Sequence, residues 1–198
     1  MTTITLQDNI LSKDEIRKKT AKPLLWIGIV SIVMFFGGWT SAVIVSKGAS
    51  SNWLNINLPI SFTISTIIII LSSLSFHYGL IAIKSNKTSQ LKWSVIITLL
   101  LGLGFVLSQY LGWKELYQNG VFATGSKSTS ASSFIYLITV FHVLHLLAGI
   151  ISLIIVGSKS FLEKYSSQNT LGVELSVIYW HFLGGLWIYL FLFLKYIA

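Results

Sequence analysis

Five long stretches of the sequence contain no lysine, arginine or aspartate, and each is long enough to cross a lipid bilayer as a helix. A spanning helix needs about 20 mainly apolar residues. The stretches cover residues 24–46, 58–83, 93–113, 131–157 and 173–194, and the one carboxylate within them is Glu174. They leave no polar face for water, which excludes a soluble bundle of buried helices. We therefore predict an all-α integral membrane bundle of five transmembrane helices.

The small share of charged residues supports the same conclusion. Charged residues make up 10% of the 198-residue chain, against about 25% in soluble globular domains. The apolar share of 54% also excludes a disordered chain. Because the sequence has no cysteine, disulfide frameworks, thiolate metal sites and cysteine nucleophiles are excluded. We predict one membrane domain over residues 24–198, preceded by a cytoplasmic tail over residues 1–23.

The basic residues alternate between the two ends of the predicted helices. Ten of the fourteen lie in the tail and in the second and fourth connecting segments: Lys13, Arg17, Lys18, Lys19, Lys22, Lys84, Lys87, Lys92, Lys159 and Lys164. Cytoplasmic segments of membrane proteins carry the excess of Lys and Arg, so we predict the N-terminus inside and the C-terminus outside. The net charge of +8 then reflects the membrane topology, and the basic residues can contact anionic lipid headgroups. We expect no nucleic-acid binding.

The fourth and fifth apolar stretches hold three of the four histidines. His142 and His145 are three residues apart, so both imidazoles lie on one face of a helix. His181 follows in the fifth stretch, next to Trp180. The two stretches run in opposite directions, so we expect the three histidines to meet at one depth. Glu174 would lie about 10 Å further inward than His181 at a rise of ~1.5 Å per residue.

Two interpretations of these histidines stay open on the residues alone. Neutral imidazole is the commonest metal ligand, so one is a metal or haem site, as in a bis-histidine membrane cytochrome. The other is a hydrogen-bonded contact between helices, which is favoured because no carboxylate lies close enough to orient the imidazoles of a metal site. His77 stands alone near the inner end of the second stretch and is interpreted as a hydrogen-bonded or an interfacial side chain rather than a ligand.

The second apolar stretch carries six hydroxyl side chains among its isoleucines: Thr63, Ser65, Thr66, Ser72, Ser73 and Ser75. Hydroxyls can bond to the carbonyls of the preceding turn, and small side chains let helices approach closely, so a packing role is favoured. A channel or transporter is the weaker alternative, since no intramembrane carboxylate or interrupted helix marks a substrate site. The sequence also lacks a phosphate-binding loop and a Ser-His-Asp pattern, and we expect no catalytic centre in this chain.

Two histidine motifs in order along the chain carry a resemblance to a known family. The first reads Phe-His-x-x-His-x-x-x-Gly from Phe141 to Gly149, and the second Tyr-Trp-His-Phe-x-x-x-Trp from Tyr179 to Trp187. Together they resemble subunit III of the haem–copper terminal oxidases, in its five-helix bacterial form. Glu174 stands where that family commonly has a glutamate. Weaker matches extend the resemblance over nearly the whole chain.

The resemblance implies a non-catalytic subunit of a respiratory oxidase in the bacterial cytoplasmic membrane. Such a subunit binds no cofactor or metal, and the haems and copper belong to subunit I, which reduces dioxygen to water and moves protons. The chain would stabilise subunit I, contact other oxidase subunits and hold membrane phospholipids. Its structural polar cluster would consist of His142, His145, Glu174, Trp180 and His181. Accessory subunits of nitric oxide reductases share the fold, so the resemblance does not decide which enzyme the chain belongs to. It also does not decide whether cytochrome c or quinol is the electron donor.

Two positions depart from the family pattern. Ile32 stands where the family usually has a carboxylate in this helix, and Gly184 stands where an aspartate usually follows the Trp-His-Phe motif. Family proposals tie the first carboxylate to proton handling. Both replacements remove charge from the bilayer, so we expect a packing and lipid-holding subunit rather than a proton-conducting element.

Overall fold

The computed structural model describes residues 13–50, 53 and 56–197, and this part of the chain forms five helices. They are α1 (Lys13–Ala49), α2 (Ile60–Lys84), α3 (Thr88–Gln118), α4 (Ser130–Phe161) and α5 (Leu171–Ile197). Each is long and apolar enough to cross a membrane. The predicted all-helical fold with five spanning helices is therefore confirmed, and the protein is a multi-pass membrane protein.

The helices extend beyond the predicted apolar stretches. α1 begins at Lys13 rather than Leu24, so residues 13–23 of the predicted tail are helical, while residues 1–12 lie outside the described part. α3 likewise continues past Trp113 to Gln118. The added turns are polar, and an apolar stretch marks only the part of a helix that lies in hydrocarbon. The start of α4 is fixed by Thr129, whose Oγ1 accepts a hydrogen bond from the backbone N–H of Ser132 at 3.2 Å.

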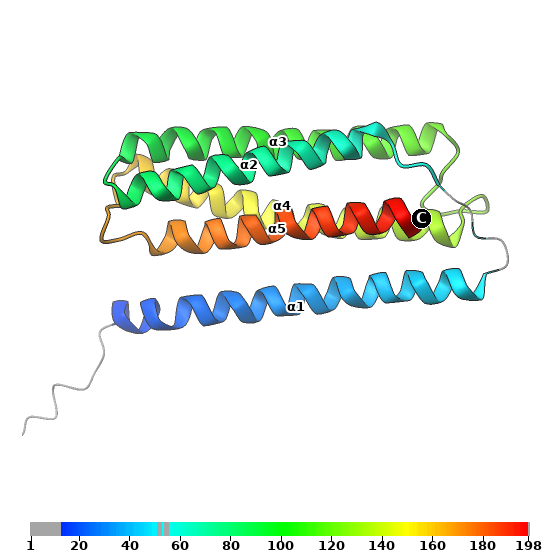
Figure 1. The fold of residues 1–198 in the computed structure, drawn as a ribbon, viewed down its shortest axis with the longest axis horizontal. Helices are drawn as coiled ribbons and strands as arrows, with labels where there is room; N and C mark the ends of the chain where they lie inside the picture. Colours follow the sequence, from blue (N-terminus) through cyan, green and yellow to red (C-terminus); the bar gives the residue numbers. More distant parts are fainter. Residues whose placement is uncertain (1–12, 51–52, 54–55, 198) are drawn as a thin grey trace, which may run out of the picture.

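Four helices form a closed bundle, and α1 lies along its side (Figure 1). α2 packs against α3, α3 against α4, α4 against α5, and α5 back against α2, whereas the described part of α1 contacts α4 and α5 alone. All five helices follow one long axis and alternate in direction. The start of α1 and the turns α2–α3 and α4–α5 therefore share one end of the molecule, and the C-terminus lies at the other.

Hydroxyl groups and glycines let α2 and α3 pack closely along their length. Ser72 Oγ donates to the carbonyl of Thr98 at 3.3 Å. Gly112 faces Phe62, and a Cβ on this glycine would lie 2.5 Å from the ring carbon Cε1. Further bonds between the two helices join Ser94 to Ser75, Ser108 to Ser61 and Gln109 to Ser65. Several of the hydroxyls of α2 are thus engaged in helix–helix contacts, which is the packing role favoured by the sequence.

Candidate functional site

Trp180 lies at the centre of the bundle, and three other helices close around it. Its side chain is 1% exposed, and its Nε1 donates to Ser72 Oγ of α2 at 3.1 Å. A Cβ on Gly102 of α3 would lie 2.8 Å from the indole carbon Cη2, and one on Gly149 of α4 would lie 3.2 Å from Cε3. The glycine that ends the first histidine motif therefore packs tightly against the tryptophan of the second, where a Cβ would require the ring to shift.

His142 is fully buried in a layer of aromatic rings. Its ring centroid lies 5.1 Å from that of Trp187, 5.8 Å from that of Phe105 and 6.4 Å from that of Phe36. The contacts with the two phenylalanines are edge-on, an arrangement that is favourable for aromatic rings. Neither ring nitrogen has a hydrogen-bond partner among the described residues. His142 thus joins α4 to α1, α3 and α5 by packing, rather than by the hydrogen bond that the sequence interpretation favoured.

His145 lies where α4 meets α1. Its Nδ1 donates to the carbonyl of Phe141 at 2.7 Å, a bond within its own helix. Because a carbonyl can only accept, Nδ1 carries the proton. The ring centroid lies 5.5 Å from that of Phe36 and 6.1 Å from that of Phe35, both on α1. The link from His145 to α5 is made by its backbone carbonyl, which accepts from the hydroxyl of Tyr179 at 3.2 Å.

His181 faces α2 instead of the other two predicted histidines. Its Nε2 lies 3.4 Å from Nδ1 of His77, and the ring centroids are 5.5 Å apart. Neighbouring residues of a helix point about 100° apart, so when Trp180 enters the bundle, His181 is turned to its side. The expectation that His142, His145 and His181 meet was wrong. His77, predicted to be a hydrogen-bonded or interfacial side chain, has His181 as its partner. Within the described residues, no group of three or more His, Asp or Glu side chains is placed to hold a metal ion.

Glu174 joins three helices at the end of the bundle where α1 begins. Its Oε2 lies 2.8 Å from Nζ of Lys22 on α1, and its Oε1 lies 3.6 Å from Nζ of Lys84 on α2. Thr170 Oγ1 also donates to Oε1, at 3.0 Å. The glutamate side chain is 20% exposed, against 51% for Lys22 and 55% for Lys84. We call Glu174, Lys22 and Lys84 the inner-end clasp, because the shared carboxylate holds the start of α1 against the bundle.

The five residues of the predicted polar cluster therefore serve separate helix contacts. Sequence reasoning assigned Lys22 and Lys84 only to membrane topology, although the alternation of basic residues already placed them at the same end as Glu174. It gave no signal for the pairing of His77 with His181, which depends on the register between α2 and α5. Ser72, the acceptor for Trp180, was recognised only as one of several small packing residues.

Both departures from the family pattern occupy packing positions. Ile32 is half-buried and packs against the hydrophobic core. Gly184 is buried, and a Cβ on it would lie 3.0 Å from Ser73 Oγ and 3.6 Å from Ile69 Cγ1 of α2. A Cβ at position 184 would therefore require a small shift of the Ser73 side chain. The close approach of α5 to α2 is therefore consistent with glycine at this position.

An apolar groove lies between α1 and α5. It has a volume of about 430 Å³ and is lined by Val33, Phe36, Gly37, Phe182, Gly185, Leu186 and Tyr189. At one end of this lining, the hydroxyl of Tyr189 donates to Thr40 Oγ1 of α1 at 3.2 Å. The apolar lining of the groove suits a hydrocarbon chain.

Comparisons with known proteins identify the family. The family model described as cytochrome c oxidase subunit III matches residues 25–198. The chain is 29% identical to cytochrome c oxidase subunit 3 of Thermostichus vulcanus, over 84% of this chain and 82% of the relative. It is 31% identical to the protein named "Probable cytochrome c oxidase subunit 3" in Mycobacterium tuberculosis, over 85% of this chain and 82% of the relative. With cytochrome c oxidase subunit 3 of Spodoptera frugiperda it shares 31% identity, over 65% of this chain and 84% of the relative. The chain therefore belongs to the cytochrome c oxidase subunit III family.

Proposed function

We propose that this subunit III is a non-catalytic part of its oxidase, which stabilises the catalytic subunit I and holds phospholipids beside it. Subunit I would carry the haems and copper, reduce dioxygen to water and move protons, in the cytoplasmic membrane of a bacterium. The observation that carries the proposal is that side chains of the second motif and Glu174 make contacts between helices. Trp180, Tyr179, Glu174 and His181 each join α5 to another helix, so these residues build a scaffold.

The outer face of α1 supports the part of the proposal that concerns partners and lipids. This face exposes large apolar side chains, among them Leu24, Trp26, Val30, Met34 and Val45. In a membrane such a face meets lipid chains or the helices of another subunit. The apolar groove between α1 and α5 opens beside it and is suited to an acyl chain. We therefore assign α1 to contacts with subunit I and with lipid.

The orientation follows from the distribution of charge. The end of the bundle with the inner-end clasp also carries Lys92 and Lys159, whereas Lys47, Lys114 and Lys195 lie toward the opposite end. We propose that the end with the clasp faces the cytoplasm, in keeping with the excess of lysine and arginine in cytoplasmic segments.

The alternative functions find no support. A bis-histidine cytochrome needs two imidazoles aimed at one iron, whereas His142 is enclosed by rings and His181 pairs with His77. A channel along α2 is disfavoured because four of the six hydroxyls noted in its sequence bond to backbone carbonyls or to side chains of α3 and α5. These four are the hydroxyls of Ser65, Thr66, Ser72 and Ser75. The relatives are named as subunits of cytochrome c oxidase, not of a nitric oxide reductase or a quinol oxidase.

Affinity purification tests the proposal directly. The membrane complex is isolated by a tag on this chain, and a haem–copper catalytic subunit is expected in equal amount. The isolated chain is expected to be colourless in the visible range, with all haem absorbance in the fraction that holds the complex. Recovery of the chain without such a subunit would overturn the proposal, and a stoichiometric Soret band from the isolated chain would favour the cytochrome.

We expect His145→Leu to leave the haem spectrum of the complex unchanged. The single side-chain hydrogen bond that is lost lies within α4, and leucine keeps an apolar contact with Phe36, so the stability loss should be about 0.6 kcal/mol or less. Thermal unfolding of the purified complex measures the loss, and its absorbance spectrum measures haem content. Altered haem content in this variant would contradict a role in packing alone.

A further inference from the structure

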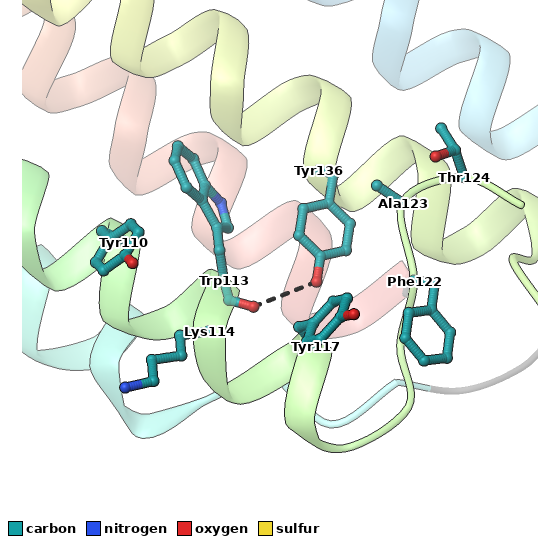
Figure 2. Close-up of a pocket in the computed structure, with 8 residues that line it drawn as sticks. All are labelled: Tyr110, Trp113, Lys114, Tyr117, Phe122, Ala123, Thr124 and Tyr136. Carbon is teal, nitrogen blue, oxygen red and sulfur yellow. Dashed lines mark hydrogen bonds between the residues drawn. The ribbon is translucent and has the colours of Figure 1, made fainter.

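A second pocket lies at the end of the bundle opposite the inner-end clasp, between the end of α3, the start of α4 and the loop that joins them (Figure 2). It has a volume of about 430 Å³. Its lining includes the rings of Tyr110, Trp113, Tyr117, Phe122 and Tyr136, together with one cation, Lys114. We call it the outer aromatic pocket.

The walls of this pocket are held in place by hydrogen bonds. The hydroxyl of Tyr136 donates to the carbonyl of Val121 at 2.9 Å and lies 3.3 Å from the carbonyl of Trp113, the second contact being the dashed line in Figure 2. Trp113 Nε1 donates to Thr139 Oγ1 at 3.0 Å. These two side chains therefore turn their polar groups toward α4 and the loop and leave ring surface for the pocket.

The remaining polar groups of the pocket are available to a ligand. Tyr110 and Tyr117 are exposed, and among the described residues their hydroxyls make no hydrogen bond. Lys114 is also exposed, and within the same part of the chain its ammonium makes neither a hydrogen bond nor an ion pair. Glu115, the next residue in the sequence, makes no ion pair with it there. The pocket thus offers one cation and two hydroxyl donors above an apolar floor.

An exposed leucine stripe leads along α3 to this cation. Leu100, Leu103, Leu107 and Leu111 are all exposed, and their spacing of three or four residues puts them on one face of the helix. Lys114 continues the same spacing one turn further. Tyrosine and tryptophan rings gather at the level of lipid headgroups, so Lys114 lies where a spanning helix leaves the hydrocarbon.

We propose that the outer aromatic pocket binds one anionic phospholipid. Its phosphate would lie against Lys114 and the hydroxyl of Tyr110, which precedes Lys114 by one turn of α3, and an acyl chain would follow the leucine stripe. A zwitterionic lipid carries its own ammonium into the pocket beside Lys114, which makes it the weaker ligand. The site deepens the lipid-holding part of the proposed function, and it lies on α3 and α4, apart from the groove between α1 and α5.

Native mass spectrometry of the full-length, delipidated chain tests the site by titration with phosphatidylglycerol. Lys114→Gln is expected to weaken the first binding event about fivefold, the contribution of one lysine near a membrane surface. Lys127→Gln removes the same charge from the loop that follows α3 and should leave the first binding event unchanged. Phosphatidylcholine should bind more weakly than phosphatidylglycerol, and millimolar inorganic phosphate should not compete, because it lacks the acyl chain.

Equal effects of the two lysine variants would overturn the site, as would equal binding of the two lipids or full competition by phosphate. Tyr110→Phe provides a second measurement, because it keeps the ring and removes one hydroxyl. If the pocket is the site, this variant should weaken the binding of phosphatidylglycerol more than the binding of phosphatidylcholine. A Lys114→Gln chain that still purifies with the catalytic subunit but has normal lipid affinity would remove this inference and leave the proposed function intact.

Discussion

Replacement of Trp180 by alanine is expected to lower the free energy of unfolding of the chain by about 3 kcal/mol, near the lower end of the range for buried tryptophans. The indole is almost fully buried and contacts glycines of two other helices. The backbone at Gly102 and Gly149 cannot fill the space that alanine would leave. Ser72 would also lose the donor that bonds to its hydroxyl. Unfolding of the purified chain in detergent, followed by circular dichroism, measures the loss.

Two variants separate the causes of this effect. Trp180→Phe keeps most of the ring volume and removes the N–H group, so its cost should fall to roughly 0.6–2 kcal/mol, the range for one interhelical hydrogen bond. Trp26→Ala removes a tryptophan that is 56% exposed on α1 and should cost less than either. If Trp26→Ala destabilises the isolated chain as much as Trp180→Ala, the central role of Trp180 is wrong.

The helices could be predicted from the sequence because a segment that crosses the hydrocarbon of the bilayer has to be apolar over its whole length. The predicted spans do not give the helix ends: residues 13–23 and 114–118 are also helical, and hydropathy does not distinguish a polar helical turn from a polar loop. The sequence also did not predict which helices pack side by side. Nothing in the composition of α1 says that it packs on α4 and α5 and not on its sequence neighbour α2, since lipid-facing and helix-facing surfaces are equally apolar.

The motif residues were recognised, but most of their partners were not. Gly149 was recognised as the end of the first histidine motif, and the structure shows it against Trp180 of the second. The grouping of His181 with His142 and His145 failed because it considered only depth in the membrane. Depth follows from residue spacing, whereas the direction of a side chain around the helix axis depends on packing. Glu174 was predicted to lie away from the histidines, and its lysine partners agree with that placement.

Reversal of the charge at Glu174 is expected to release the start of α1 from the bundle. A lysine at this position would face Lys22 and Lys84, so two attractions would become repulsions. Hydrogen bonds to a charged group contribute about 1.5–3 kcal/mol each when they are buried, and the 20% exposure of this carboxylate favours a value near 2 kcal/mol for the whole contact. The backbone of α1 does not closely approach α2 or α3 in the described residues, whereas α2 and α5 pack against each other at many other positions. Loss of the clasp should therefore release α1, while the four-helix bundle loses only the Lys84 contact and stays folded.

Spin labels can follow this release, since the chain has no native cysteine. Labels on Leu24→Cys of α1 and Ile81→Cys of α2, both exposed positions, should give one narrow distance distribution in the parent chain and a broad one after Glu174→Lys. Lys22→Gln should broaden it more than Lys84→Gln, because Lys22 is the partner on α1 and makes the shorter contact. Glu163→Lys is the matched control: it reverses a carboxylate that is 77% exposed and pairs with Lys92 of α3. An unchanged distribution in Glu174→Lys, or an equal change in Glu163→Lys, would mean that α1 is held by its other contacts with α4 and α5 and not by the clasp.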